Sequence, residues 1–74
     1  MDVKIFRELA RPSGFRPFTM VFFTGDTIKI DHPEHLTAIE GEADVVVLVP
    51  GGGWRIVDSR AVREVQLVKS NNAA

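Results

Sequence analysis

Two histidines and two carboxylates lie together in the stretch Ile-Asp-His-Pro-Glu-His, and the chain has no other histidine. A metal site would use His32, His35 and one carboxylate, with both imidazoles about 2.0–2.1 Å from the ion. A second reading makes His32 and Glu34 an acid/base pair. A third is a kinked turn at Pro33, capped by Asp31 or His32. We favour the turn, because side chains three apart diverge in an extended chain and no nucleophile or oxyanion hole is evident nearby.

The glycine-rich stretch Pro50–Gly53 is the next candidate, because glycine loops can bind phosphate. Such loops lead into a helix whose N-terminus faces the anion, and a Lys with a Ser or Thr usually follows. Here residues 54–57, Trp-Arg-Ile-Val, come next, and their composition is typical of a strand. We therefore interpret the glycines as a hairpin loop.

Aromatic side chains and arginines raise the alternative that the chain binds single-stranded RNA. Trp54, Phe22 and Phe23 offer flat faces on which bases can stack. The candidate RNA-contacting cations are Arg7, Arg11, Arg16 and Arg55, with Arg60 and Arg63 as further positive charges. However, the net charge is −1, and residues 19–44 hold six acidic side chains against one lysine. Such an acidic belt repels a nucleic-acid backbone, so RNA is the less favoured partner.

The composition is that of one small folded domain without covalent cross-links. The chain has 74 residues, of which 45% are hydrophobic and 26% charged, and it contains no cysteine. Disulfides and thiolate ligands are therefore excluded, and packing or assembly must provide the stability. No stretch approaches the roughly 20 apolar residues of a membrane span, and the sequence does not open on a signal core. We expect a soluble cytoplasmic protein that is not an enzyme and holds no cofactor or metal.

The apolar pattern predicts one helix followed by short strands. Residues 3–10 carry an apolar stripe at helical spacing, with Asp2 as the N-cap and Pro12 as the stop. Strands are predicted at 18–24 and 27–31, joined by Gly25-Asp26, and then at 45–49, 54–58 and 63–69. Residues 36–40 fit either a strand or a helical turn, reversals follow at 41–44 and 59–62, and 70–74 form a polar tail. In the last strand Val65, Leu67 and Val62 are expected to point inward.

The fold class is predicted as mainly β with one N-terminal α-helix, forming a small five-stranded barrel over residues 1–69. Short strands joined by tight reversals cannot bury their faces as a flat sheet in so few residues, whereas a barrel can. The order of elements resembles the SH3-like barrels and in particular the Sm-like fold. Residues 56–67 are similar to the strand, one-turn helix and strand that end those barrels. The RNA-contacting residues of Sm-like proteins have no match in this sequence.

A second resemblance is to a group of small bacterial proteins of uncharacterised function. The shared pattern runs through Phe15-Arg16-Pro17-Phe18-Thr19, the Gly-Asp hairpin, His32-Pro33-Glu34 and the closing stretch from Asp58 to Val65. This pattern spans most of the chain, and the resemblance implies no activity.

Five consecutive aliphatic residues at 45–49 indicate a strand that is covered on both faces. Successive strand side chains point to opposite faces, and the outer face of a small barrel is usually wet. Either the N-terminal helix or a second copy must cover that face, and one short helix can hardly also cover the adjacent aromatics of the first strand. The expected interaction residues are Phe22, Val45, Val47, Val49 and Trp54. We therefore expect a binding module that forms a homo-oligomer, with another protein as an alternative partner.

Overall fold

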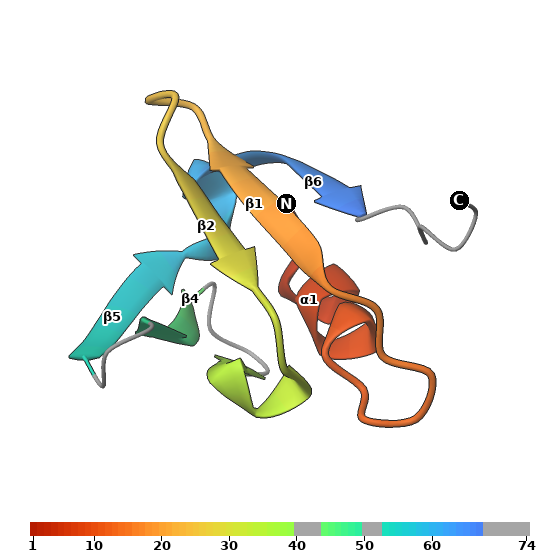
Figure 1. The fold of residues 1–74 in the computed structure, drawn as a ribbon. Helices are drawn as coiled ribbons and strands as arrows, with labels where there is room; N and C mark the ends of the chain where they lie inside the picture. Colours follow the sequence, from red (N-terminus) through yellow and green to blue (C-terminus); the bar gives the residue numbers. More distant parts are fainter. Residues whose placement is uncertain (40–43, 50–52, 68–74) are drawn as a thin grey trace.

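The computed structural model describes residues 1–39, 44–49 and 53–67, apart from the side chains of Asp44, Val46 and Leu48. The centre of the predicted reversal at 41–44, the glycine loop before Gly53 and the tail at 70–74 fall outside these residues. These described residues form one α-helix, followed by strands and two one-turn 3-10 helices, and Figure 1 shows their arrangement. Within the described segments, no helix has the length and the apolar character needed to cross a membrane.

The N-terminal helix, α1 (Val3–Leu9), lies where the apolar stripe predicted it. Asp2 caps this helix, because its carboxylate accepts a hydrogen bond of 3.0 Å from the backbone N–H of Lys4. Phe6 is fully buried, and the other apolar residues of the stripe are partly buried against the same core. A helix of seven residues is not stable alone in water, so the docking of Phe6 keeps it folded.

The hairpin predicted at the Gly-Asp pair is present as β1 (Phe18–Phe22) and β2 (Thr27–Ile30). Gly25 has a φ of +97°, which residues with a side chain rarely adopt. Two backbone hydrogen bonds of 2.9 Å close the turn, from the Phe22 N–H to the Asp26 carbonyl and from the Gly25 N–H to the Phe22 carbonyl. The turn therefore depends on glycine at its third position.

Past the hairpin, short elements alternate with one-turn helices. In chain order they are η1 (Pro33–His35), β3 (Leu36–Ala38), β4 (Asp44–Val49), β5 (Gly53–Asp58), η2 (Ser59–Ala61) and β6 (Val62–Leu67). Pro33 stands at the first position of η1, where its fixed φ suits a helical turn and its missing N–H costs nothing. The prediction of a turn at His32-Pro33 is confirmed, and residues 36–38 take the strand alternative.

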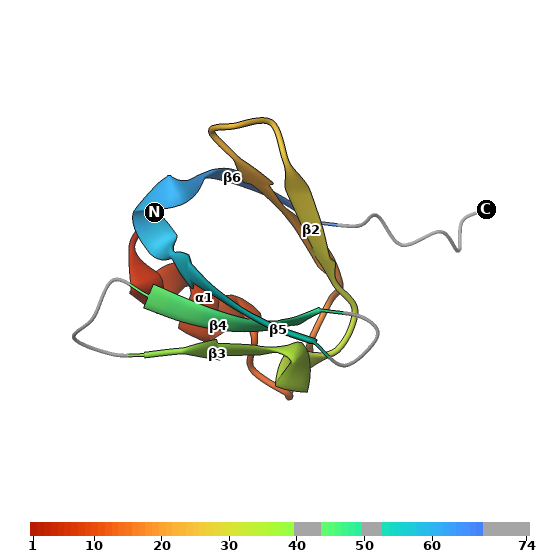
Figure 2. The ribbon, with the colours of Figure 1, turned by 90° about the vertical axis from the view of Figure 1, so that its left-hand side faces the viewer.

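The strands form two antiparallel three-stranded sheets, with orders β2-β1-β6 and β3-β4-β5. In Figure 2 the sheets lie as two layers, and α1 lies beside β3 and β4. The prediction of a mainly β fold with one helix is confirmed. The five predicted strands are all present, and a further short strand, β3, is described where the sequence left a strand or a helical turn open. No strand pairing joins the two sheets over the part of the chain that the structure describes.

One hydrophobic core connects the helix and both sheets. Its fully buried members include Phe6 from α1, Phe18 and Met20 from β1, and Val45 and Val47 from β4. Because neither sheet has a core of its own, we expect the two sheets to unfold together.

A bulge adjusts β6 to β1. Val21 lies opposite Glu64 but Phe22 lies opposite Val62, so the register shifts by one residue at Arg63. The shift brings the buried side chains of Phe22 and Val62 together. The prediction that Leu67 points inward is wrong. Its side chain is exposed at the end of β6, which is an edge strand.

Candidate binding site beside β5

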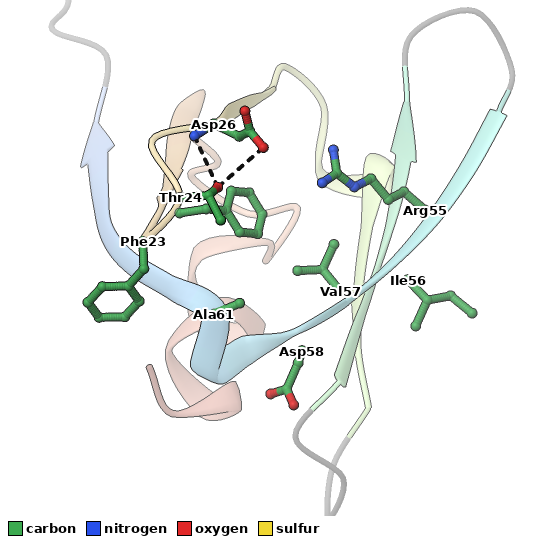
Figure 3. A pocket seen from close by; sticks show the side chains of 9 residues that line it. Phe23, Thr24, Asp26, Arg55, Ile56, Val57, Asp58 and Ala61 are labelled. Atoms are coloured by element: carbon green, nitrogen blue, oxygen red, sulfur yellow. Dashed lines mark hydrogen bonds between the residues drawn. The ribbon is translucent and has the colours of Figure 1, made fainter.

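A pocket of about 320 Å³ opens between the β1–β2 turn, β5 and η2 (Figure 3). Its lining residues are Phe22, Phe23, Thr24, Asp26, Arg55, Ile56, Val57, Asp58 and Ala61. Four consecutive residues of β5 line it, although the side chains of a strand alternate between its faces. The pocket therefore runs along the backbone of β5, at the side where this last strand of its sheet has no neighbour.

Arg55 supplies the positive charge of the pocket. Its guanidinium carbon lies 5.6 Å from the centroid of the Phe22 ring, within the range of a cation–π contact. Phe22 is only 4% exposed, so the ring is a fixed part of the core. Arg55 forms no ion pair with any residue that the structure describes. In Figure 3 the guanidinium extends from β5 across the pocket toward the turn that carries Asp26.

The wall opposite Arg55 is the β1–β2 turn, which hydrogen bonds hold in shape. The Thr24 hydroxyl donates to the Asp26 carboxylate at 3.2 Å, and the Asp26 N–H donates to the same hydroxyl at 3.3 Å (Figure 3). The Phe23 N–H donates to the Ala61 carbonyl at 3.0 Å. Backbone contacts thus set the position of the turn relative to η2.

Asp58 lies at the end of the pocket and is paired within its own turn. Its carboxylate accepts hydrogen bonds from the Arg60 backbone N–H at 2.9 Å, from Nε at 3.0 Å and from Nη2 at 2.6 Å. The side-chain bonds first, and then the backbone bond, lower the pKa of Asp58 from 3.8 to about 2. Arg60 therefore offsets the charge of Asp58, and Arg55 and Asp26 remain as the facing charges of the pocket.

The outer face of β5, by which we mean Trp54 and Ile56, is apolar. Each of the two side chains is 71% exposed, and residues two apart in a strand project from the same side. In Figure 3 Ile56 points away from the pocket. The helix α1 does not cover this face, since its buried residue Phe6 belongs to the core.

The structure separates the five predicted interaction residues. Phe22, Val45 and Val47 are buried in the core, and Phe22 also contributes to the lining of the pocket. They are buried because alternate side chains of β1 and β4 face inward. Val49 is partly buried and Trp54 is exposed. The two-sided cover predicted for β4 depends on Val46 and Leu48, whose side chains lie outside the described residues.

The four predicted RNA-contacting arginines are not brought together. Arg7 lies on α1, Arg11 and Arg16 follow it in the connection to β1, and Arg55 lies on β5. Figure 1 shows α1 and this connection on the other side of the molecule from β5. Arg11 forms an ion pair of 3.1 Å with Glu8.

The two histidines of the candidate metal site lie next to each other. The ring centroids of His32 and His35 lie 4.9 Å apart in an edge-to-face arrangement. His32 occupies the N-cap of η1 without a capping hydrogen bond from its side chain. Across residues 1–39, 44–49 and 53–67, no three His, Asp or Glu side chains converge as ligands for a metal ion.

No protein-family model, curated protein or solved structure matches this chain. The pocket and the outer face of β5 therefore have to carry the functional argument. Sequence reasoning missed Ile56, although its spacing of two from Trp54 was a usable signal. It also missed Asp26. This carboxylate lies across the pocket from Arg55 only because the β1–β2 turn and β5 form opposite walls of the pocket in the folded chain.

Proposed function

We propose that this protein is a non-enzymatic binding module, built as a small barrel of the SH3-like or Sm-like type, that associates with itself through the outer face of β5. The observation that carries the proposal is the 71% exposure of both Trp54 and Ile56 on one side of an edge strand. Large apolar side chains that lie side by side on a surface are typical of interaction sites.

Three features support the barrel. The two sheets share one core, β6 returns to pair with β1, and β5 passes into β6 through the one-turn helix η2. The chain thereby crosses from one sheet to the other within three residues. This ending resembles the strand, one-turn helix and strand of the SH3-like and Sm-like barrels.

A second copy is the occupant that the outer face of β5 favours. Fully burying one large apolar side chain stabilises by about 1.5–3 kcal/mol, and a two-fold contact uses each side chain of the face twice. The helix cannot take this role, because its apolar stripe is already docked in the core.

Size exclusion with light scattering tests the association. We expect the wild-type chain at tens of micromolar to have a multiple of the monomer mass, and Ile56→Lys to be monomeric because it places a charge in the contact. Thr27→Lys is the matched control, since Thr27 is an exposed residue of another edge strand, β2, and this variant should keep the wild-type mass. A monomeric wild-type chain contradicts self-association, and turnover that is abolished by His32→Ala contradicts the non-enzymatic part.

Binding of single-stranded RNA is the second candidate, favoured by the neighbouring exposed Trp54 and Arg55 on β5. A base would stack on Trp54 at the outer face, while Arg55, on the other side of the β5 edge, would supply positive charge to the RNA backbone, and stacking tolerates any base. We expect a salt-sensitive gel shift that is lost in Arg55→Gln and weakened by Arg7→Glu with Arg11→Glu. The absence of a shift at low salt contradicts this candidate.

A further inference from the structure

We propose that the free edge of β5 binds an extended peptide segment of another protein as an added strand, with an apolar residue of the segment opposite Val57 and an acidic residue opposite Arg55. This site uses the edge and the inward side of β5, whereas the proposed self-association uses its outer face. Either of the two proposals can therefore fail while the other holds.

The first step concerns the backbone of β5. This strand pairs only with β4, and no backbone hydrogen bond to another described segment occupies its second side. Every second residue of an edge strand directs its N–H and C=O away from the sheet, and these groups are a template for a further strand. The pocket keeps this side open, because consecutive residues Arg55 to Asp58 line it along the backbone.

The second step concerns the side chains that the added strand would meet. Arg55 and Val57 lie two apart and therefore project to the same side of β5, the side of the pocket and of Phe22. Directly opposed residues of neighbouring strands are in contact. An antiparallel segment therefore presents, from its N- to its C-terminal direction, an apolar residue opposite Val57, any residue, and then a residue opposite Arg55.

The third step concerns the charge opposite Arg55. The guanidinium is held against the Phe22 ring and forms no ion pair within the described segments, so its N–H donors face the pocket. A carboxylate matches this planar fork with two parallel hydrogen bonds, which are the stronger, charge-assisted kind. An acidic residue is therefore the complement at this position.

Asp26 sets a limit on what the site accepts. Its carboxylate lies across the pocket and adds negative charge to the lining. A single carboxylate in contact with Arg55 outweighs the repulsion from Asp26, which acts over a longer distance and through solvent. A polyanion such as a nucleic-acid strand would place several charges near Asp26, so the lining favours a peptide with one acidic residue.

The test uses three capped, monomeric peptides in which every second residue is threonine. They differ only in their central residues, which are Leu-Thr-Asp, Leu-Thr-Asn or Leu-Thr-Lys. Binding is followed by NMR through the backbone amide shifts of residues 53–58 and of the β1–β2 turn. We expect the Asp peptide to bind about tenfold more tightly than the Lys peptide, as for a charge-assisted pair at a partly exposed site. In Arg55→Glu the order should reverse, whereas Arg63→Glu, an exposed site on β6, should leave it unchanged.

N-methylation of the peptide tests the added strand itself. Methyl groups on the amides that face β5 should abolish the shifts, while methyl groups on the alternate amides should spare them. The proposal is overturned if no peptide shifts these amides at millimolar concentration, or if binding ignores both the Asp-to-Lys exchange and Arg55→Glu. It is also overturned if the same amides shift with protein concentration alone in Ile56→Lys, the variant designed to lack the outer-face contact, because a second copy then occupies the edge, or if single-stranded RNA shifts them and the peptides do not.

Discussion

Asp58 accepts three hydrogen bonds from Arg60, one from the backbone N–H and two from the guanidinium, and this contact shapes the link between β5 and β6. It caps η2 in the way that an aspartate caps the first turn of a longer helix. The same contact lowers the pKa of Asp58 to about 2, so the stability of the link depends on pH.

We expect the contribution of Asp58 to folding to disappear in acid. Its pKa is lower in the folded chain, about 2, than its ordinary value of 3.8. The stabilisation is therefore complete above pH 3.8 and is lost as the pH falls through about 2. Urea unfolding at pH 5, 4, 3 and 2 measures how the free energy of unfolding falls with pH. Asp58→Asn should lower this free energy at pH 5 and make its fall toward pH 2 smaller. Glu34→Gln, in the other 3-10 turn, is the control that should keep the wild-type decline.

Two adjacent phenylalanines should respond to truncation in opposite ways. Phe22 is 4% exposed and Phe23 is 67% exposed. Phe22→Ala should cost about 3–5 kcal/mol of unfolding free energy, because it leaves a cavity in the core. Phe23→Ala should stay within about 0.5 kcal/mol. Denaturant unfolding of both variants decides the matter, and equal losses would contradict the burial described for the end of β1.

The N-cap of α1 should be measurable in a chain this small. Asp2→Ala removes the acceptor of the Lys4 N–H and should cost about 1 kcal/mol. Asp2→Asn and Asp2→Ser keep an acceptor at this position and should restore most of that loss. Thermal unfolding of the three variants tests the order, and a stability of Asp2→Ala equal to wild type would mean that the cap contributes nothing.

Two glycines offer a matched test of backbone strain. A Cβ added at Gly25 or at Gly53 meets nothing within 4 Å, but only Gly25 has a positive φ, of +97°. Gly25→Ala should cost about 1–2 kcal/mol from backbone strain alone. Gly53→Ala should be neutral or stabilising by up to about 1 kcal/mol, because it restricts the unfolded chain. Chemical denaturation distinguishes them, and a neutral Gly25→Ala would contradict the turn geometry.

Local signals in the sequence were sufficient to predict where the helix and the main turns lie. The helix from Val3, the turn at Gly25 and the break at Pro33 each follow from residue types whose backbone preferences are strong. The choice between a strand and a helical turn at residues 36–40 stayed open, because the three residues of β3, Leu36–Ala38, are too few to show an alternation of their own. Their pairing with β4 makes them a strand, and such pairing cannot be read from a single segment.

The site was less predictable than the elements. Phe22 and Phe23 are neighbours of the same type, yet one belongs to the core and the other to the surface. Arg55 was expected to contact RNA together with arginines near the helix, but its neighbours are Phe22 and the wall that carries Asp26. These neighbours come from segments about thirty residues away, and only the packing of the two sheets brings them together.

The pairing of β1 with β6 has a consequence for how the chain acquires its structure. The partner positions, from Phe22 with Val62 to Phe18 with Leu67, are at least 40 residues apart in the chain. During synthesis the β1–β2 hairpin therefore emerges long before the strand that covers its second side. Contacts between residues so far apart in the chain slow folding. Until β6 is synthesised, the apolar residues and the unpaired edge of β1 stay exposed and prone to aggregation. The six residues Val62–Leu67 are thus the segment whose synthesis allows the second side of β1 to pair.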